Sequence, residues 1–366
     1  MKMTEIPTQH SQRVRDRRIE RVVELMPPVQ ILDDLPLTPT QEDAVLRHRA
    51  EVASILDRTD DRLLVVVGPC SVHDVGAALD YAQRLTEQAS ELRSELCVAM
   101  RVYFEKPRTT IGWKGLINDP HLDGTGDVNT GLRKARQLLL ELLDLGLPIG
   151  CEFLDPITPQ YISDLVAWGA IGARTTESQI HRQLASGLSM PVGFKNRTDG
   201  NVKVAVDAVR AAAAKHAFAG IDVSGAPAIL HTDGNPDCHV ILRGGRGKPN
   251  YDRPSVDDAL SQLREAGLPE QVVIDASHDN SGKDHEHQPV VVSEIADQIA
   301  SGRESIVGVM LESFLVAGRQ DLKPGAEVVY GQSITDACMD WETTVLALDR
   351  LAAAARERRD AGHSPA

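Results

Sequence analysis

Eight short apolar runs are spaced along the chain, and each is followed by a residue that can take part in chemistry. Near-continuous apolar strands that alternate with helical segments indicate parallel strands covered on both faces. The pattern predicts an α/β fold, a (β/α)8 TIM barrel, with its active site at the carboxyl ends of the strands. The residues that follow the runs are, in chain order, Cys70, Arg101, Glu152, Arg174, Lys195, Arg243, His278 and Glu312.

Helical composition fills most of the intervals between these runs. The residue before the earliest helix, Thr38, has the character of an N-cap, with Pro39 in the first turn and the helix running to about Leu56. The other helices are expected over Ala77–Ser94, Leu132–Leu145, Pro159–Trp168, Gln179–Leu188, Val202–Lys215, Ser255–Ala266, Val290–Ser301 and Asp336–Arg359.

The length of 366 residues suits one barrel of roughly 250 residues with additions. We expect the catalytic barrel to occupy residues 61–360, after an N-terminal extension over 1–60 that serves regulation or oligomerisation. The extension either packs on a neighbouring subunit or covers the bottom of the barrel. Residues 216–238 predict an inserted β-hairpin, and residues 361–366 a flexible tail.

Composition narrows the function classes. The net charge is −14, from 39 Lys and Arg against 53 Asp and Glu, which argues against binding nucleic acid or an anionic membrane. No apolar run approaches the roughly 20 residues of a membrane span, and the N-terminal segment does not have the pattern of a signal peptide. The five cysteines form no CxxC pair. These features predict a cytoplasmic protein.

Cys70, His278, Glu312 and Asp336 would share one rim of the barrel. One thiolate, one imidazole and two carboxylates can hold Mn, Fe, Co, Zn or Cu. Taken alone, Cys70 or His278 is more often a buried structural residue, and Cys70 could instead be a nucleophile. A rival His-x-His motif at 284–287 lies in a polar loop and is a weaker metal candidate.

Six cations, four of them directly after apolar runs, predict a pocket for an anionic ligand at the same rim. A single arginine is usually a surface residue in a weak ion pair, but convergence at strand ends favours a ligand with more than one negative group. The cations are Arg101, Lys106, Arg108, Arg174, Lys195 and Arg243.

Long motifs resemble type I 3-deoxy-D-arabino-heptulosonate 7-phosphate (DAHP) synthases of the feedback-regulated subgroup. The resemblance runs from about Arg13 to Arg359, and a departure such as Arg197, where Gly is common, lies away from the reacting centre. The stretches that carry it are 68–74 (GPCSVHD), 101–110 (RVYFEKPRTT), 112–120 (GWKGLINDP), 169–178 (GAIGARTTES), 191–196 (PVGFKN), 241–245 (ILRGG), 308–313 (GVMLES) and 330–338 (YGQSITDAC).

The resemblance implies condensation of phosphoenolpyruvate with erythrose 4-phosphate, the first step of the shikimate pathway to aromatic amino acids. It implies that Cys70, His278, Glu312 and Asp336 hold one divalent ion, Mn, Fe, Co or Zn. Phosphoenolpyruvate would be bound by Arg101, Lys106, Glu152, Ala173, Arg174, Lys195 and Arg243, and erythrose 4-phosphate by Lys106, Pro107, Arg108, Thr109 and Asp336.

Within that reaction, Lys106 would protonate the developing alkoxide, and Glu152, with Lys195 beside it, would activate the attacking water. Asp336 would complete the catalytic set. Two other classes stay open: a sister enzyme that uses arabinose 5-phosphate, and a non-catalytic barrel that binds aromatic amino acids. The Lys106-Pro107-Arg108-Thr109 run favours the four-carbon aldose, and the intact candidate ligands argue against the non-catalytic barrel.

The resemblance also implies an effector site outside the active site and a homodimer or homotetramer. The position of Gly220 tends to carry Ser in phenylalanine-sensitive members and Gly in tyrosine-sensitive ones, and Gly leaves room for a phenol hydroxyl. We therefore expect inhibition by tyrosine rather than phenylalanine. The expected effector residues are Asp155, Pro156, Ser189, Phe218 and Gly220.

Overall fold

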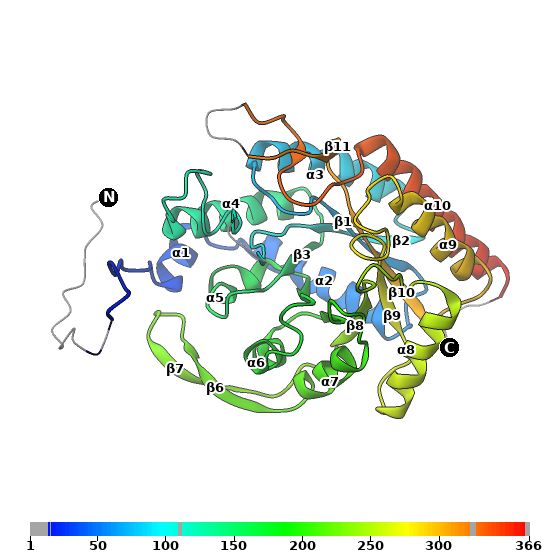
Figure 1. The fold of residues 1–366 in the computed structure, drawn as a ribbon, viewed down its shortest axis with the longest axis horizontal. Helices are drawn as coiled ribbons and strands as arrows, with labels where there is room; N and C mark the ends of the chain where they lie inside the picture. Colours follow the sequence, from blue (N-terminus) through cyan, green and yellow to red (C-terminus); the bar gives the residue numbers. More distant parts are fainter. Residues whose placement is uncertain (1–13, 15, 109–111, 323–326, 363–366) are drawn as a thin grey trace.

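In a computed structural model that describes residues 14, 16–108, 112–322 and 327–362, eight parallel strands close into a barrel (Figure 1). The order around the barrel is β1-β10-β9-β8-β5-β4-β3-β2. These strands coincide with the eight apolar runs, so the predicted fold class is confirmed. Their bounds are β1 Leu63–Gly68, β2 Leu96–Arg101, β3 Ile149–Glu152, β4 Trp168–Ile171, β5 Val192–Lys195, β8 His239–Leu242, β9 Val272–Asp275 and β10 Ile306–Glu312.

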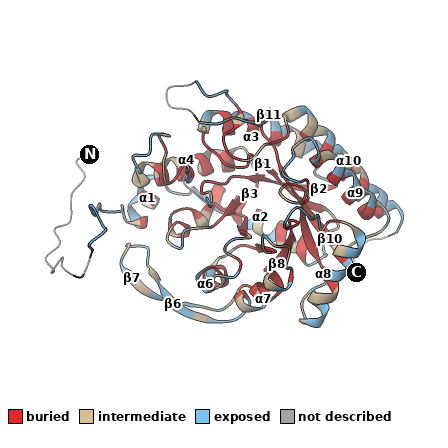
Figure 2. Cartoon of the chain, in the orientation of Figure 1, coloured by how far each residue is buried: buried red, intermediate tan, exposed pale blue. Residues whose placement is uncertain are grey.

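Every residue of the eight strands is buried, as expected for strands covered by helices outside and by packed side chains inside (Figure 2). The interior contains Trp168, whose Nε1 donates to Nε2 of the buried His239 at 3.2 Å. The barrel is therefore a filled core, and ligands can enter only at its rim.

Helices surround the barrel and bury their inner faces against it (Figure 2). They are α3 Val75–Glu91, α4 Val128–Asp144, α5 Pro159–Ile162, α6 Gln179–Gly187, α7 Lys203–Ala212, α8 Arg253–Glu265, α9 Gln288–Ala300 and α10 Trp341–Asp360, with a 3-10 turn η1 over Ser163–Leu165.

Two helix predictions differ from the structure by more than four residues at one end. The helix predicted over Pro159–Trp168 ends as α5 and η1, because Val166 is already extended and Trp168 begins β4. The helix predicted from Asp336 begins at Trp341, since the Asp340 carboxylate caps it by accepting from the backbone N of Thr343 at 2.9 Å. Asp336 consequently lies in a loop at the barrel rim.

The extension contains α1 Pro28–Asp34 and α2 Pro39–Leu56. Thr38 caps α2 in a reciprocal capping box with Gln41. Val52 and Ile55 of α2 are buried in one cluster with the strand residues Leu64 and Val66. Helix α2 thus covers the bottom of the barrel, opposite the rim that carries the candidate site.

The segment after α7 forms the predicted hairpin, β6 His216–Ile221 paired antiparallel with β7 Pro227–Thr232, and it lies outside the barrel (Figure 1). Its base is joined to α6, where the Ser186 and Thr232 hydroxyls lie 2.7 Å apart. Its tip accepts a hydrogen bond from the extension, Val29 N to Val223 O at 2.8 Å. A second two-stranded pair, β11 Val316–Arg319 and β12 Gln332–Ser333, precedes α10.

None of the described helices combines the length and the apolar character needed to cross a membrane.

Candidate active site

The carboxyl ends of the strands surround a cavity of about 260 Å³ at the barrel rim. It opens between the β2 loop, the β4 end and the loop before α10. Ten of the predicted site residues line it: Lys106, Pro107, Arg108, Glu152, Ala173, Arg174, Lys195, Arg243, His278 and Asp336. Another predicted residue, Thr109, lies outside the described residues.

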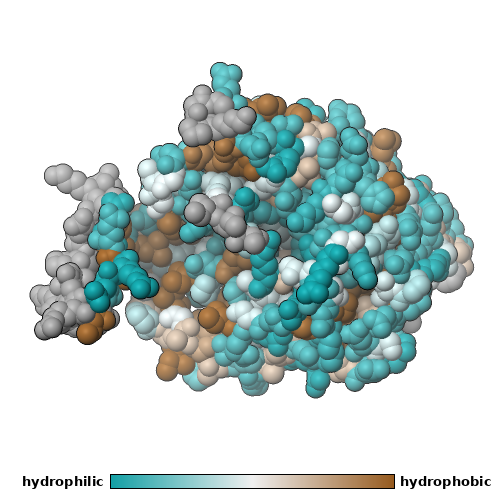
Figure 3. Space-filling view, viewed as in Figure 1, coloured by the Kyte–Doolittle hydropathy of each residue, from teal (hydrophilic) through white to brown (hydrophobic). Residues whose placement is uncertain are grey.

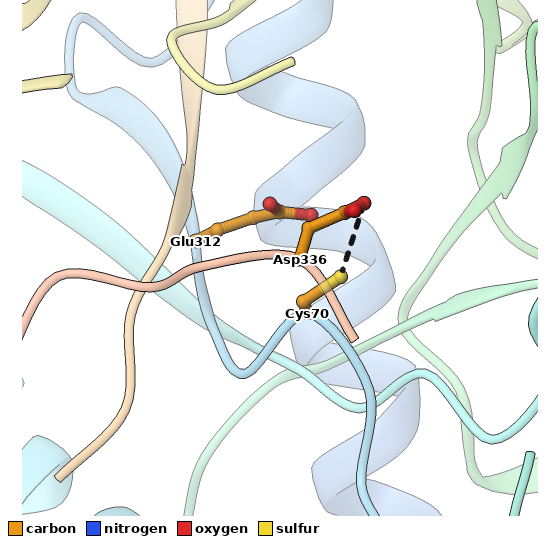
Figure 4. A group of neighbouring side chains, drawn as sticks. All are labelled: Cys70, Glu312 and Asp336. Atoms are coloured by element: carbon orange, nitrogen blue, oxygen red, sulfur yellow. Dashed lines mark hydrogen bonds between the residues drawn. The ribbon is translucent and has the colours of Figure 1, made fainter. Parts of the chain in front are cut away.

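Cys70, Glu312 and Asp336 form the candidate metal cluster. Their ligand atoms lie within 4.8 Å of one another, and the side chains point toward a common centre (Figure 4). Among the described residues this is the only group of three or more such side chains that could hold a metal ion. His278 lies beside it, with Nε2 3.8 Å from Oε1 of Glu312.

Local backbone geometry explains how distant residues reach this centre. Gly68 ends β1 beside Arg101, which ends β2. The two backbones are so close that a Cβ at position 68 would lie 2.6 Å from the Arg101 carbonyl oxygen. His278 adopts a positive φ of 56°, three residues beyond β9. Such left-handed backbone is uncommon outside glycine, and it turns the imidazole back toward the rim.

Two cations lie against the acidic cluster. Lys106 Nζ donates to Cys70 Sγ at 3.0 Å, and Arg101 Nη2 donates to Glu312 Oε1 at 2.9 Å. Burial opposes ionisation of Asp336, but Lys106 and His278 outweigh it and lower the pKa of Asp336 to about 2. Burial and the Glu312 charge raise the pKa of Cys70 to about 11.

The donor set fits a divalent transition ion. A thiol, two carboxylates and an imidazole offer the soft and hard donors that such ions accept. The cluster is buried except for Asp336 and His278, which line the cavity. An ion at this cluster would therefore lie next to whatever occupies the cavity.

The cations of the rim form the other half of the site. Arg174, Lys195 and Arg243 line the cavity, while Arg101 lies beneath it with its guanidinium 3.8 Å above the Tyr103 ring. Within the described residues, Nη1 of Arg101 is buried without a hydrogen-bond partner. A buried guanidinium nitrogen left unpaired is costly, so this atom favours an anionic ligand.

One functional candidate, Asp275, was missed by sequence reasoning. Its Oδ2 lies 2.9 Å from both Lys195 Nζ and His278 Nδ1, and its Oδ1 accepts from Ser277 N at 3.0 Å. Burial disfavours its charge, but Lys195 and His278 hold the pKa of Asp275 well below its usual range. A charged residue ending an apolar strand was the available signal.

The loop that carries Lys106 is fastened to its neighbour by another buried carboxyl. Glu105 accepts from the backbone N of Asp155 at 3.3 Å and from that of Leu154 at 3.4 Å. Burial and the nearby Asp155 raise the pKa of Glu105 to about 8. The β2 and β3 loops are therefore joined directly behind the cavity.

The rival motif at 284–287 lies in the loop before α9. His285 Nδ1 is 3.9 Å from its neighbour Asp284. None of the four residues belongs to the candidate metal group, so the geometry favours the Cys70 cluster.

The five expected effector residues lie outside the cavity on three neighbouring segments. Asp155 and Pro156 are exposed in the β3 loop, Ser189 is exposed after α6, and Phe218 and Gly220 are half-buried on β6. His181 of α6 hydrogen-bonds the Leu154 carbonyl at 2.7 Å, and α6 in turn contacts β7. These contacts make the three segments neighbours.

The chain is similar in sequence and in fold to known proteins. Residues 37–349 match the model of the DAHP synthetase I family. The Phe-sensitive phospho-2-dehydro-3-deoxyheptonate aldolase of Escherichia coli K12 is 55% identical over 344 residues, covering 94% of this chain and 98% of that protein. The tyrosine-inhibited one of Schizosaccharomyces pombe is 50% identical over 356 residues, covering 96% of each.

A solved structure of phospho-2-dehydro-3-deoxyheptonate aldolase from Francisella tularensis SCHU S4 superposes with a TM-score of 0.91 at 51% identity, covering 93% of this chain and 100% of that one. Fold, family match and relatives agree over nearly the full length. The chain belongs to the DAHP synthetase I family.

Proposed function

We propose that this enzyme condenses phosphoenolpyruvate with D-erythrose 4-phosphate and water to give DAHP and phosphate, at the entry to the shikimate pathway. The observation that carries the proposal is that one cavity joins a cluster suited to a divalent ion with a set of cations suited to a substrate that has two anionic groups. Neither half alone indicates this reaction.

The cations provide for phosphoenolpyruvate. Its carboxylate and phosphate need several positive partners, and arginine can pair with each bidentately. Arg101, Arg174, Lys195 and Arg243, together with Glu152 and Ala173, would bind it. Holding C3 of this weak nucleophile near the aldehyde replaces an improbable bimolecular encounter with a positioned one.

Erythrose 4-phosphate would lie across the cavity, against Lys106, Pro107, Arg108 and Asp336, with Thr109 the further expected contact. When a divalent ion is bound by Cys70, His278, Glu312 and Asp336, it supplies Lewis acidity for the aldehyde. Lys106 would donate a proton to the oxygen that becomes an alkoxide. Burial works against the Lys106 charge, but Cys70 and Glu312 raise its pKa, so the ammonium stays protonated.

The second half of the reaction needs water at C2 of phosphoenolpyruvate before phosphate leaves. Glu152 lines the cavity between the cations and is buried. We assign it the activation of that water, with Lys195 beside it. General-base catalysis of this kind typically contributes about 10²–10⁴ in rate.

Tyrosine is the proposed feedback inhibitor, bound near Asp155, Pro156, Ser189, Phe218 and Gly220. The names of the relatives include both Phe-sensitive and tyrosine-inhibited enzymes, so they do not choose between the two amino acids. Gly220 supports tyrosine, since the absence of a side chain leaves room for a phenol hydroxyl.

We further propose a homodimer or homotetramer in the cytoplasm, with the extension at a subunit contact. The support is apolar exposure near the extension and hairpin: Val14 is 89% and Ile229 72% exposed. On the face drawn in Figure 3, brown apolar areas interrupt a mostly hydrophilic surface. Light scattering of the purified protein tests this, and a monomer at micromolar concentration would refute it.

A metal-supplemented assay tests the proposed reaction. The chelator-treated protein is given Mn²⁺ and phosphoenolpyruvate, with either erythrose 4-phosphate or arabinose 5-phosphate. We expect phosphate release and a seven-carbon product with erythrose 4-phosphate, lost when the metal is withheld. Turnover only with the five-carbon aldose, or no turnover with any of Mn²⁺, Fe²⁺, Co²⁺ or Zn²⁺, would refute the proposal.

A further inference from the structure

Three asparagines at the barrel rim have no part in the proposed chemistry, yet they are hydrogen-bonded to one another. Asn196 directly follows Lys195 at the end of β5, Asn250 lies in the loop after Arg243, and Asn280 follows the β9 end. Asn196 is fully buried and Asn280 is 3% exposed. Buried carboxamides at a substrate-binding rim need a physical reason.

Asn196 uses its full hydrogen-bonding capacity. Its Oδ1 accepts from the backbone N of Arg243 at 2.8 Å and from Asn250 Nδ2 at 3.2 Å. Its Nδ2 donates to the carbonyls of Arg197 and Gly244, each at 2.9 Å. Two donors and two acceptors, all engaged, leave a single orientation of the amide.

Asn280 extends the same network to the next strand. Its Nδ2 donates to the carbonyl of Asp275 at 2.8 Å and to that of Leu242 at 3.3 Å, and its Oδ1 accepts from Asn250 N at 2.8 Å. Asn250 closes the network by accepting from Gly244 N at 2.7 Å.

The network lies where the registered strand pairs end. The registered pairs between β5 and β8 end at Lys195 and Ile241, and those between β8 and β9 at Leu242 and Ile274. Beyond these pairs, the carboxamides join the three strand ends, alongside the backbone hydrogen bond from Asn196 N to the Ile241 carbonyl at 3.0 Å and the Lys195–Asp275 ion pair. The backbone of Arg243 is attached to the residue after Lys195.

We propose that this asparagine network positions Lys195 and Arg243 relative to each other, so that both cations meet the two anionic groups of one phosphoenolpyruvate. The inference rests on the proposed function. Asn196 is its central positioning residue. The aldose-phosphate residues come from the β2 loop and, for Asp336, from the loop before α10. The hydrogen bonds of the network reach neither loop, so its effect is confined to one of the two substrates.

The test compares Asn196→Ala with Asn235→Ala. Asn235 is also buried, and its Nδ2 donates to the carbonyls of Ala185, Leu188 and Met190, away from the rim. Both changes remove a satisfied carboxamide, and both should lower the melting temperature. Only Asn196 adjoins a predicted phosphoenolpyruvate contact.

For the Mn²⁺-loaded enzyme without amino acids, we expect Asn196→Ala to raise the KM for phosphoenolpyruvate at least tenfold and the KM for erythrose 4-phosphate less than twofold. Calorimetry with phosphoenolpyruvate alone should give the same loss in affinity at unchanged stoichiometry. A merely structural role would reduce the active fraction, and hence kcat and stoichiometry, and leave both KM values as they are.

Equal phosphoenolpyruvate affinity in the two variants, or an equal rise in both KM values for Asn196→Ala, would overturn the inference. If Asn196→Ala does not fold, Asn280→Ala replaces it, with an expected rise of threefold or more in the phosphoenolpyruvate KM only. Wild-type protein that binds phosphoenolpyruvate without condensing it would refute the proposed function, and the calorimetric comparison would still decide the role of the network.

Discussion

At the scale of single residues, the site depends on charges placed against charges. Arg101 donates to Glu312, and Asp275 accepts from both Lys195 and His278. In a buried setting each of these groups is stable only with its partner, because an unpaired buried charge is strongly disfavoured. Single substitutions here should therefore have distinct and separable effects.

Removing the proposed proton donor should impair catalysis more than metal binding. We expect Lys106→Ala to lower kcat by at least about tenfold, since general-acid assistance to the alkoxide is lost. The Cys70, His278, Glu312 and Asp336 side chains stay in place, so Mn²⁺ should still bind in a calorimetric titration. Near-normal turnover in this variant would contradict the assignment of Lys106.

Asp275→Asn should weaken metal binding. A carboxylate that holds the second nitrogen of a ligating histidine fixes the ring, and its loss typically costs about 10- to 100-fold in affinity. Titration of chelator-treated protein with Mn²⁺ measures this. Asp279→Asn is the matched control, because Asp279 pairs with Arg243 instead. Equal metal affinities in the two variants would refute the role of Asp275.

At the scale of elements, loops and the hairpin connect the rim to the outer surface. Glu105 joins the β2 loop to the β3 loop, and α6 joins the β3 loop to β7. An effector held near the hairpin could therefore bias the loop that carries Lys106 without touching the substrates. Such coupling requires that the effector bind two arrangements of these loops unequally.

Gly220→Ser should shift inhibition from tyrosine toward phenylalanine. A Cβ at position 220 would lie 2.8 Å from Cδ1 of Leu230, the end of a flexible side chain that can move aside. The fold should therefore tolerate serine while space for the phenol hydroxyl is lost. Inhibition curves for both amino acids measure the ratio. An unchanged preference, or inhibition of the wild type by phenylalanine or tryptophan only, would contradict the effector proposal.

At the scale of the whole molecule, the filled barrel interior makes stability depend on pH. Burial lowers the pKa of His239 from 6.5 to about 4, and its ring is held neutral between Trp168 and the Asp237 carbonyl. His48 on α2 behaves alike, with burial and Arg47 lowering its pKa to about 4. In acid, both histidines take up a proton more readily in the unfolded chain than in the folded protein.

The free energy of unfolding should fall as the pH drops from 6.5 toward 4. The folded-state pKa of His239 is below the unfolded value, so the unfolded state binds more protons in this window. A shift of this size corresponds to about 3 kcal/mol. Urea unfolding at pH 7 and pH 4.5 measures it. His239→Gln should reduce the dependence to the part that His48 contributes, whereas His231→Gln, on the exposed face of β7, should leave it unchanged.

The sequence by itself determined the barrel and most of its rim, because hydrophobic runs and the residues that follow them are local properties of the chain. Arg243 and Glu152 were predicted at strand ends. Glu152 ends β3, Arg243 directly follows β8, and both line the cavity. The long motifs around Cys70 and Lys195 indicated the family. Composition could not place the start of α10, which depends on the cap formed by Asp340.

Tertiary structure alone decided which side chains meet. Cys70 and Asp336 are 266 residues apart, and Lys195 and Asp275 are 80 apart, yet each pair is in contact. The network of Asn196, Asn250 and Asn280 follows no local pattern, and the partners of Asp275 cannot be read from its place at a strand end, since these partners come from neighbouring strands. Closure of the barrel brings these residues together, and a pattern along the sequence does not contain the distances between side chains on different strands.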